Sequence, residues 1–93
     1  MEEADFPMDP NIKRIVVDAL KSREIPLIDL SKALCKIEGT DEVDIVVTEV
    51  DTTTETIKIT LRGSNVSYEG LLTIIEDYAT VIRSIDEINL HRI

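Results

Sequence analysis

Residues 43–62 read VDIVVTEVDTTTETIKITLR and contain the clearest strand pattern in the chain. From Ile57 to Arg62 apolar and polar side chains alternate, which is typical of a strand with one buried face. The segment Val43–Val50 is rich in β-branched residues and favours a second strand. The residues between them, 51–54, are one Asp and three Thr. They favour a turn, because Asp and Thr side chains can hydrogen-bond their own backbone. The stretch therefore predicts two consecutive strands joined by a short turn.

One predicted helix precedes these two strands and another follows them. The first helix begins near Pro26, after a polar connection at residues 21–24, and ends at Gly39, which suits a left-handed C-cap. The second helix begins after Ser67, a suitable N-cap. Each helix has one apolar stripe at helical spacing, formed by Leu27, Leu30, Leu34 and Ile37 in the first and by Tyr68, Leu71, Leu72, Ile75, Tyr78 and Ala79 in the second.

Two further strands are predicted near the ends of the chain, at residues 12–20 and 81–88. The order of elements is then β-α-β-β-α-β. Two interleaved right-handed crossovers give a four-stranded antiparallel sheet in the order 4-1-3-2 with both helices on one face. This is the α+β, ferredoxin-like split βαβ fold. We expect it to span residues 12–93, preceded by a flexible N-terminal arm at residues 1–11.

The chain is short and acidic. Its 93 residues suit one domain, and its formal net charge is −9. Acidic surfaces repel nucleic acid and anionic membranes, so neither is an expected partner. The single cysteine forms no internal disulfide, which fits a reducing compartment. The start of the chain lacks the pattern of a secretion signal, and the apolar runs are too short to span a bilayer, so we expect a cytoplasmic protein.

Few side chains offer catalytic chemistry. Cys35 lies on the flank of a predicted helix, where we expect an inert, packed thiol. His91 falls in the predicted C-terminal tail, which is a poor place for a general base. The three glycines are separated and form no phosphate-binding loop, and the predicted strands lack the aromatic residues that stack RNA bases. We therefore expect no enzymatic activity.

Two helices can cover only one face of a four-stranded sheet. Asp18 is costly to bury beneath them without a partner, so the alternate residues Ile15, Val17 and Ala19 are predicted to face the helices. Neighbouring apolar residues then point to the uncovered face, where exposed apolar patches often mark association surfaces. This reasoning predicts a homo-oligomer interface formed by Val16, Leu20, Val46 and Val50.

Acidic side chains gather where the first and last strands are expected to pair. With these strands centred near residues 16 and 84, Asp86 faces Arg14 and Asp18 faces Ile82, and a one-residue slip brings Glu87 opposite Arg14. One interpretation is a cross-strand ion pair of Arg14 with Asp86 or Glu87. The other is a site for Ca²⁺ or another divalent cation formed by Asp18, Asp86 and Glu87, completed by water or a second subunit. A second acidic group is interpreted as the solvated side of the hairpin and consists of Glu49, Asp51 and Glu55.

Four segments of the chain resemble a known archaeal family, the domain of unknown function 211. They are the first strand ending in Val17-Asp18, the helix ending in Gly39, the strand Val43–Val50 and the stretch Ser84-Ile85-Asp86-Glu87-Ile88. The resemblance covers about residues 12–93 and implies a ferredoxin-like subunit that assembles into ring-like oligomers, with no established activity. Arg83 stands where family members often have His, which argues against a His-dependent site.

Two functional hypotheses follow from the residues and from this resemblance. The first is a non-catalytic, homo-oligomeric binding or scaffold module, because the sequence combines an apolar open sheet face with a lack of catalytic groups. The alternative is an acidic sensor of a divalent cation or small ligand, with its sites near subunit interfaces.

Overall fold

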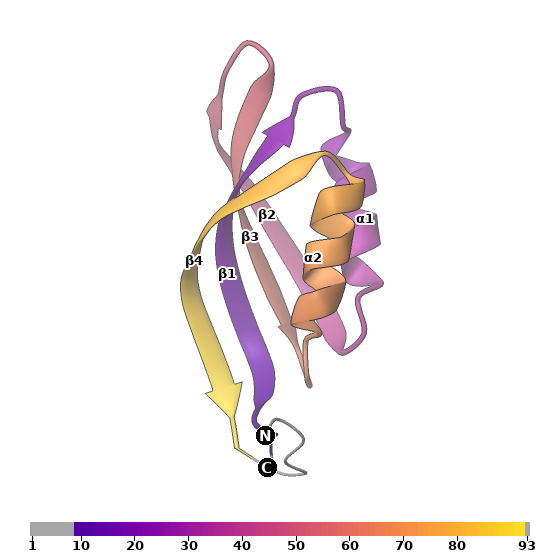
Figure 1. Ribbon diagram of the computed structural model, residues 1–93, viewed down its shortest axis with the longest axis vertical. Helices are drawn as coiled ribbons and strands as arrows, with labels where there is room; N and C mark the ends of the chain where they lie inside the picture. Colours follow the sequence, from indigo (N-terminus) through magenta and orange to yellow (C-terminus); the bar gives the residue numbers. More distant parts are fainter. Residues whose placement is uncertain (1–8, 93) are drawn as a thin grey trace, which may run out of the picture.

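The computed structural model describes residues 9–92 and has the predicted order of elements. These are β1 (Asn11–Ser22), α1 (Leu27–Cys35), β2 (Thr40–Val50), β3 (Thr54–Gly63), α2 (Tyr68–Asp77) and β4 (Thr80–His91). The strands form one antiparallel sheet in the order β2-β3-β1-β4, and both helices lie on one side of it (Figure 1). The predicted ferredoxin-like split βαβ fold is confirmed. Most of the predicted N-terminal arm lies outside the described residues, and Asn11 already belongs to β1.

The helices are shorter than the sequence predicts. α1 ends at Cys35, whose side chain is exposed, so the prediction of a packed thiol is wrong. Gly39 has a positive φ of 82°, and a Cβ atom there would lie 1.8 Å from the backbone oxygen of Asn65, so this close crossing requires glycine. Ser67 is confirmed as the N-cap of α2, because its Oγ accepts a hydrogen bond from the backbone N–H of Gly70 at 3.0 Å. Among the described residues, no helix has the length and apolar character that crossing a membrane requires.

The core lies between the sheet and the two helices. The side of the sheet that the helices cover is called the helix side below, and the other side is called the open face. Alternate residues of β1 and β3 supply the sheet half of the core, as predicted, and burial of each large apolar side chain contributes about 1.5–3 kcal/mol. The core cluster consists of Ile15, Val17, Ala19, Leu30, Leu34, Ile37, Ile57, Ile59, Leu61, Val66, Leu71 and Ile75.

β4 contains two bulges, each with one extra residue. Asp18 pairs with Ser84 while Ala19 pairs with Ile82, so Arg83 is an extra residue. By the same reasoning Asp86 is the extra residue of the second bulge, since its two neighbours pair with consecutive residues of β1. The bulges shift the register away from the one the sequence predicts. The predicted pairings of Asp86 with Arg14 and of Asp18 with Ile82 are wrong.

The bulges in β4 also decide which residues share a face. In an antiparallel pair, directly opposite residues lie on the same side of the sheet. Ile82, Ile85 and Ile88 are three residues apart, yet each pairs with a helix-side residue of β1. Strict alternation would have sent Ile85 to the open face. The last strand therefore directs an unbroken apolar row to the helix side.

A bulge in β2 changes the position of one predicted interface residue. Val47 pairs with Ile57 and Glu49 pairs with Thr56, which leaves Thr48 as the extra residue. Val50 consequently lies on the helix side, opposite to the side on which Val46 lies. The prediction that Val46 and Val50 share the open face is wrong, because it assumed unbroken alternation along this strand.

The molecule is elongated, with a longest dimension of 46 Å. Figure 1 shows that β1 and the second half of β4 run together beyond the helices toward the end where both termini lie. The β2–β3 hairpin projects at the opposite end. The sheet is therefore longer than the helix layer that covers it, and part of its helix side has no cover.

Candidate interaction surface

Ion pairs cover the open face of the sheet where β1, β3 and β4 lie side by side. Lys58 on β3 reaches Asp86 on β4 at 3.2 Å, and this contact must cross β1, which lies between the two strands. Arg14 on β1 pairs with Glu87 on β4, so one of the two cross-strand ion pairs that the sequence suggested is present. Val16 lies opposite Glu87 and is only 3% exposed. It is already buried within its own chain and offers no surface to a second subunit.

The other residues predicted for an interface are distributed over both sides of the sheet. Val46 is exposed on the open face, and Leu20 is half-buried on the same face beside the exposed Val81. Val50 is exposed on the helix side, near the projecting hairpin. The four positions Val16, Leu20, Val46 and Val50 therefore do not form one continuous apolar patch.

The three carboxylates predicted as cation ligands each have a basic partner. Asp18 accepts a hydrogen bond from Nε of Arg83 at 3.2 Å, and Asp86 and Glu87 have the lysine and arginine partners described above. Within residues 9–92, no three side chains of Asp, Glu, His or Cys gather in a way that could hold a metal ion. Cations of the protein itself thus neutralise these carboxylates. A site for Ca²⁺ or another divalent cation gains no support from this arrangement.

Asp86 is held in its charged form by two neighbours. Oγ of Ser84 donates a hydrogen bond to Oδ1 of Asp86 at 2.7 Å, and Nζ of Lys58 approaches Oδ2 at 3.2 Å. The hydrogen bond from Ser84 and then the contacts with Lys58 lower the pKa of Asp86, because they stabilise the carboxylate relative to the neutral acid. The bulge at Asp86 is therefore tied to both its own strand and β3.

Lys21 is a buried charged residue that the sequence reasoning missed. Its side chain is almost fully buried, and Nζ lies 2.9 Å from Oε1 of Glu55. Nζ also donates hydrogen bonds to the backbone oxygens of Ser22 at 3.0 Å and Ile25 at 2.6 Å, so three acceptors match its three hydrogens. The interpretation of Glu55 as part of a solvated hairpin is wrong. Every second residue of β1 from Ile15 to Ala19 faces the helices. The same alternation, continued for two more positions, predicts that Lys21 also faces the helices.

An exposed apolar strip lies on the helix side of β4. Ile85, Ile88 and Leu90 are 48%, 52% and 53% exposed, and each pairs with an apolar residue of β1 on the core side of the sheet. We call these three residues the β4 strip. It lies on the edge strand of the sheet. The strip continues the hydrophobic core from β1 outward to this edge, where the apolar side chains are about half exposed. His91 belongs to this strand and not to a tail, which corrects the sequence-based prediction.

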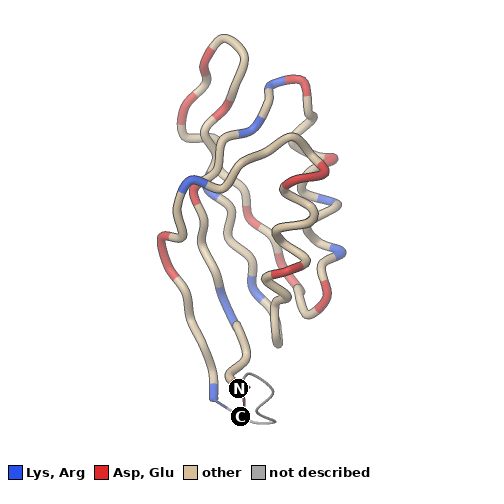
Figure 2. The backbone as a smooth tube through the Cα atoms, in the orientation of Figure 1, with Lys and Arg blue, Asp and Glu red and all other residues tan. Residues whose placement is uncertain are grey.

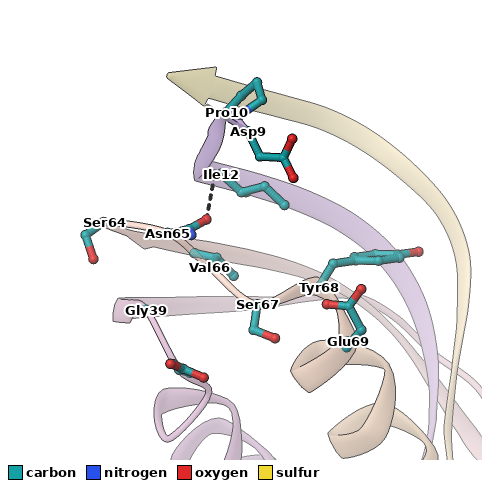
Figure 3. A pocket seen from close by; sticks show the side chains of 11 residues that line it. Asp9, Pro10, Ile12, Gly39, Ser64, Asn65, Val66, Ser67, Tyr68 and Glu69 are labelled. Atoms are coloured by element: carbon teal, nitrogen blue, oxygen red, sulfur yellow. Dashed lines mark hydrogen bonds between the residues drawn. The ribbon is translucent and has the colours of Figure 1, made fainter. Parts of the chain in front are cut away.

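A pocket of about 780 Å³ lies where β1 begins and α2 starts. Figure 3 shows Asp9, Tyr68 and Glu69 around it, and a hydrogen bond from the N–H of Ile12 to Oδ1 of Asn65 at 3.2 Å. That bond fastens the loop before α2 to the start of β1. Its lining combines carboxylates, a phenol ring, serine hydroxyls, an amide and apolar side chains, and none of the lining residues is Lys, Arg, Cys or His.

The fold and surface together define a small ferredoxin-like α+β domain with a charged open face and an apolar strip on its last strand. The chain belongs to the family of domain of unknown function 211 (DUF211), described as uncharacterized ArCR, whose model matches residues 13–91. This confirms the family resemblance seen in the sequence. The chain is also 39% identical over 77 residues to the uncharacterized protein MJ0319 of Methanocaldococcus jannaschii, a match that covers 83% of this chain and 79% of that protein. Neither description states an activity.

Proposed function

We propose that this protein is a non-catalytic cytoplasmic module that acts as a homo-oligomer, serving as a binding or scaffold subunit. The observation that carries the proposal is the β4 strip. Three large apolar side chains, each about half exposed, stand side by side on one strand. Contiguous exposed apolar surface of this kind is characteristic of association sites.

The charges on the open face support the proposal that the main contact between subunits is made by the β4 strip. Ion pairs that are partly exposed to water lose hydration when a second surface covers them, and their mutual attraction does not always repay that loss. The open face is crossed by Lys58–Asp86, Arg14–Glu87 and Arg83–Asp18. Burying the β4 strip carries no such cost, because its side chains have no polar atoms. The proposed contact therefore differs from the one predicted from the sequence.

A ring, which the family resemblance implies, requires contacts on two sides of each subunit. β2 and β4 are the two edge strands of the sheet, so the β4 strip supplies one contact on one side. Val46 on β2 is exposed at the opposite edge and is the candidate for the second contact. We propose the ring on this basis.

Analytical ultracentrifugation of the purified protein at micromolar concentration tests the proposal. We expect a mass well above the 10.5 kDa of one chain. Ile88→Asp is expected to weaken association by at least about a hundredfold, because it would bury an unpaired charge in the contact.

Ile28→Asp is the matched control, since Ile28 is an equally large apolar residue, 66% exposed, in the first turn of α1. It is expected to leave the mass unchanged, and circular dichroism of both variants checks that they fold. A wild-type mass of one chain would contradict the proposal, and equal effects of both substitutions would contradict the role of the β4 strip.

A further inference from the structure

The pocket between the start of β1 and the N-terminus of α2 receives acidic side chains from three separate segments. Asp9 precedes β1, Glu38 follows α1 and Glu69 lies in the first turn of α2. Figure 2 shows acidic positions in the loop after α1 and at the start of α2, at the same end of the helix layer. The volume of about 780 Å³ falls within the range of about 300–1,000 Å³ that is usual for small-molecule sites. The pocket therefore combines the size of such a site with three carboxylates.

Within residues 9–92, the acids of the pocket differ from those of the sheet in their ion pairing. Among the ion pairs of these residues, none includes Asp9, Glu38 or Glu69. The acids that do form such pairs are Asp18, Glu42, Asp44, Glu55, Asp86 and Glu87. Residues 2–5 of the sequence add three further acids within seven residues of Asp9. Charges of one sign that line a concave site attract a ligand of the opposite sign, so the pocket selects a cation.

The spacing of the carboxylates decides which kind of cation fits. Asp9, Glu38 and Glu69 line one pocket, yet no three Asp, Glu, His or Cys side chains of the described residues lie close enough to hold one metal ion. Figure 3 shows the carboxylates of Asp9 and Glu69 on either side of the Tyr68 ring. A metal ion requires its oxygen ligands within about 2.6 Å, which carboxylates spread around a pocket do not provide. A ligand whose positive charges are distributed along a chain can reach all three.

The remaining lining of the pocket suits the uncharged parts of such a chain. Pro10, Ile12 and Val66 supply apolar surface, and Val66 is only 2% exposed, so it lies at the base of the pocket. Methylene groups of a ligand gain free energy by packing on such surface. The ring of Tyr68 adds an aromatic face, which attracts an ammonium group within about 6 Å of its centre. The lining therefore alternates between groups that bind ammonium and groups that bind methylene.

The N-terminus of α2 does not turn this pocket into an anion site. The free N–H groups of a helix N-terminus attract anions. Here Oγ of Ser67 already accepts a hydrogen bond from the N–H of Gly70 at 3.0 Å. Glu69 in the first turn supplies a negative charge that the helix dipole stabilises. An anionic ligand would therefore meet repulsion from the carboxylates and find the cap position occupied.

We propose that this pocket binds a linear aliphatic polyamine. Its ammonium groups pair with Asp9, Glu38 and Glu69, and the methylene segments between them pack on Ile12 and Val66. The inference goes beyond the proposed function, because it gives the binding module a class of ligand, and it does not depend on assembly into a homo-oligomer.

Isothermal titration calorimetry of the full chain with spermidine tests the proposal. A salt concentration of about 0.15 M screens the net charge of the protein beyond about 8 Å and suppresses diffuse binding. We expect one spermidine per chain. Putrescine, which has one ammonium group fewer, is expected to bind about fivefold more weakly, because it loses one exposed ion pair. Millimolar Mg²⁺ is expected to change the affinity for spermidine by no more than about twofold, since Mg²⁺ retains its water unless it finds octahedral ligands.

A matched pair of substitutions in α2 tests the location. Glu69→Gln and Glu76→Gln remove the same charge from exposed residues of one helix, but only Glu69 lines the pocket. Glu69→Gln is expected to weaken spermidine binding about fivefold, and Glu38→Gln combined with Glu69→Gln about twentyfold. Glu76→Gln is expected to stay within about twofold of the wild type. Circular dichroism without spermidine checks that each variant folds.

The outcomes separate this inference from the proposed function. Absence of binding at millimolar spermidine overturns the polyamine site, and so do equal effects of Glu69→Gln and Glu76→Gln. A tetralysine peptide that binds in the pocket more tightly than spermidine overturns the assignment of a free polyamine, because a basic segment of a protein is then the better ligand. A monomeric wild type that binds spermidine as expected overturns the proposed assembly and supports the polyamine site.

Discussion

The pair of Lys21 and Glu55 is expected to be the most costly ion pair of the described structure to break. Lys21 is 1% exposed, and its ammonium group bonds to Glu55 and to two backbone oxygens. Glu55→Ala leaves this ammonium buried without a counter-charge. Removing one partner of a buried pair costs about 3–5 kcal/mol. Because the Glu55 side chain is 21% exposed and water can reach its place, we expect about 3 kcal/mol.

This loss would be a large part of the total stability, which is about 5–14 kcal/mol for a domain of this length. Urea unfolding followed by circular dichroism measures it, at one fixed protein concentration because association also stabilises the folded state. A double-mutant cycle of Glu55→Ala with Lys21→Met is expected to give a coupling energy of about 2 kcal/mol.

Asp44→Ala is the control for this experiment. It removes a carboxylate from an ion pair with Arg62 whose two side chains are 53% and 41% exposed, and it should cost no more than about 1 kcal/mol. If Glu55→Ala destabilises the protein no more than Asp44→Ala does, the reasoning that Lys21 is a charge buried in the core is refuted.

Three further predictions concern the bulge, the end of α2 and the carboxylates of the open face. Ser84→Ala is expected to raise the pKa of Asp86 toward its usual value, because it removes the hydrogen bond that contributes most to lowering it; an NMR titration of the carboxyl carbon measures this. The pKa of Asp86 is lower in the folded state than in the unfolded state, where it is about 3.9. The stabilisation that Asp86 contributes is therefore present above the unfolded-state pKa and disappears as the pH falls through the folded-state pKa. The free energies of unfolding of wild type and variant should consequently converge in acid. Ala79→Gly is expected to stabilise the fold by about 0.5–1 kcal/mol, because Ala79 has a positive φ of 52° that glycine adopts without strain, and a lower melting temperature would contradict this. Millimolar Ca²⁺ is expected to leave the melting temperature unchanged, because each carboxylate of the suggested cation site already has a basic partner, whereas a rise of several degrees would support that site.

The sequence by itself determined the elements and their connection. The alternation from Ile57 to Arg62 and the apolar stripes of the two helices depend on local periodicity, which is the same in the sequence and in the fold. The handedness of β-α-β connections then leaves few arrangements for four strands and two helices. The burial of Ile15, Val17 and Ala19 also followed from the cost of placing Asp18 beneath the helices.

Only the tertiary structure decided which residues of the two edge strands face the same way. The bulges at Thr48, Arg83 and Asp86 depend on how each strand fits its neighbour, and a single extra residue moves every later side chain to the other side of the sheet. The sequence reasoning assumed unbroken alternation and therefore misplaced Val50 and the partners of Asp86.

The burial of Lys21 and the exposure of the β4 strip have a common cause, because the two helices cover only part of the side of the sheet on which they pack. Periodicity assigns a residue to a face of the sheet, but the position of the helices over that face decides whether the residue is covered. Lys21 lies in a covered part of the sheet, so its buried ammonium group requires Glu55 as a counter-charge and two backbone carbonyl oxygens as hydrogen-bond acceptors. Ile88 lies on the outermost strand of the sheet, so an apolar side chain on the core side of the sheet still meets solvent.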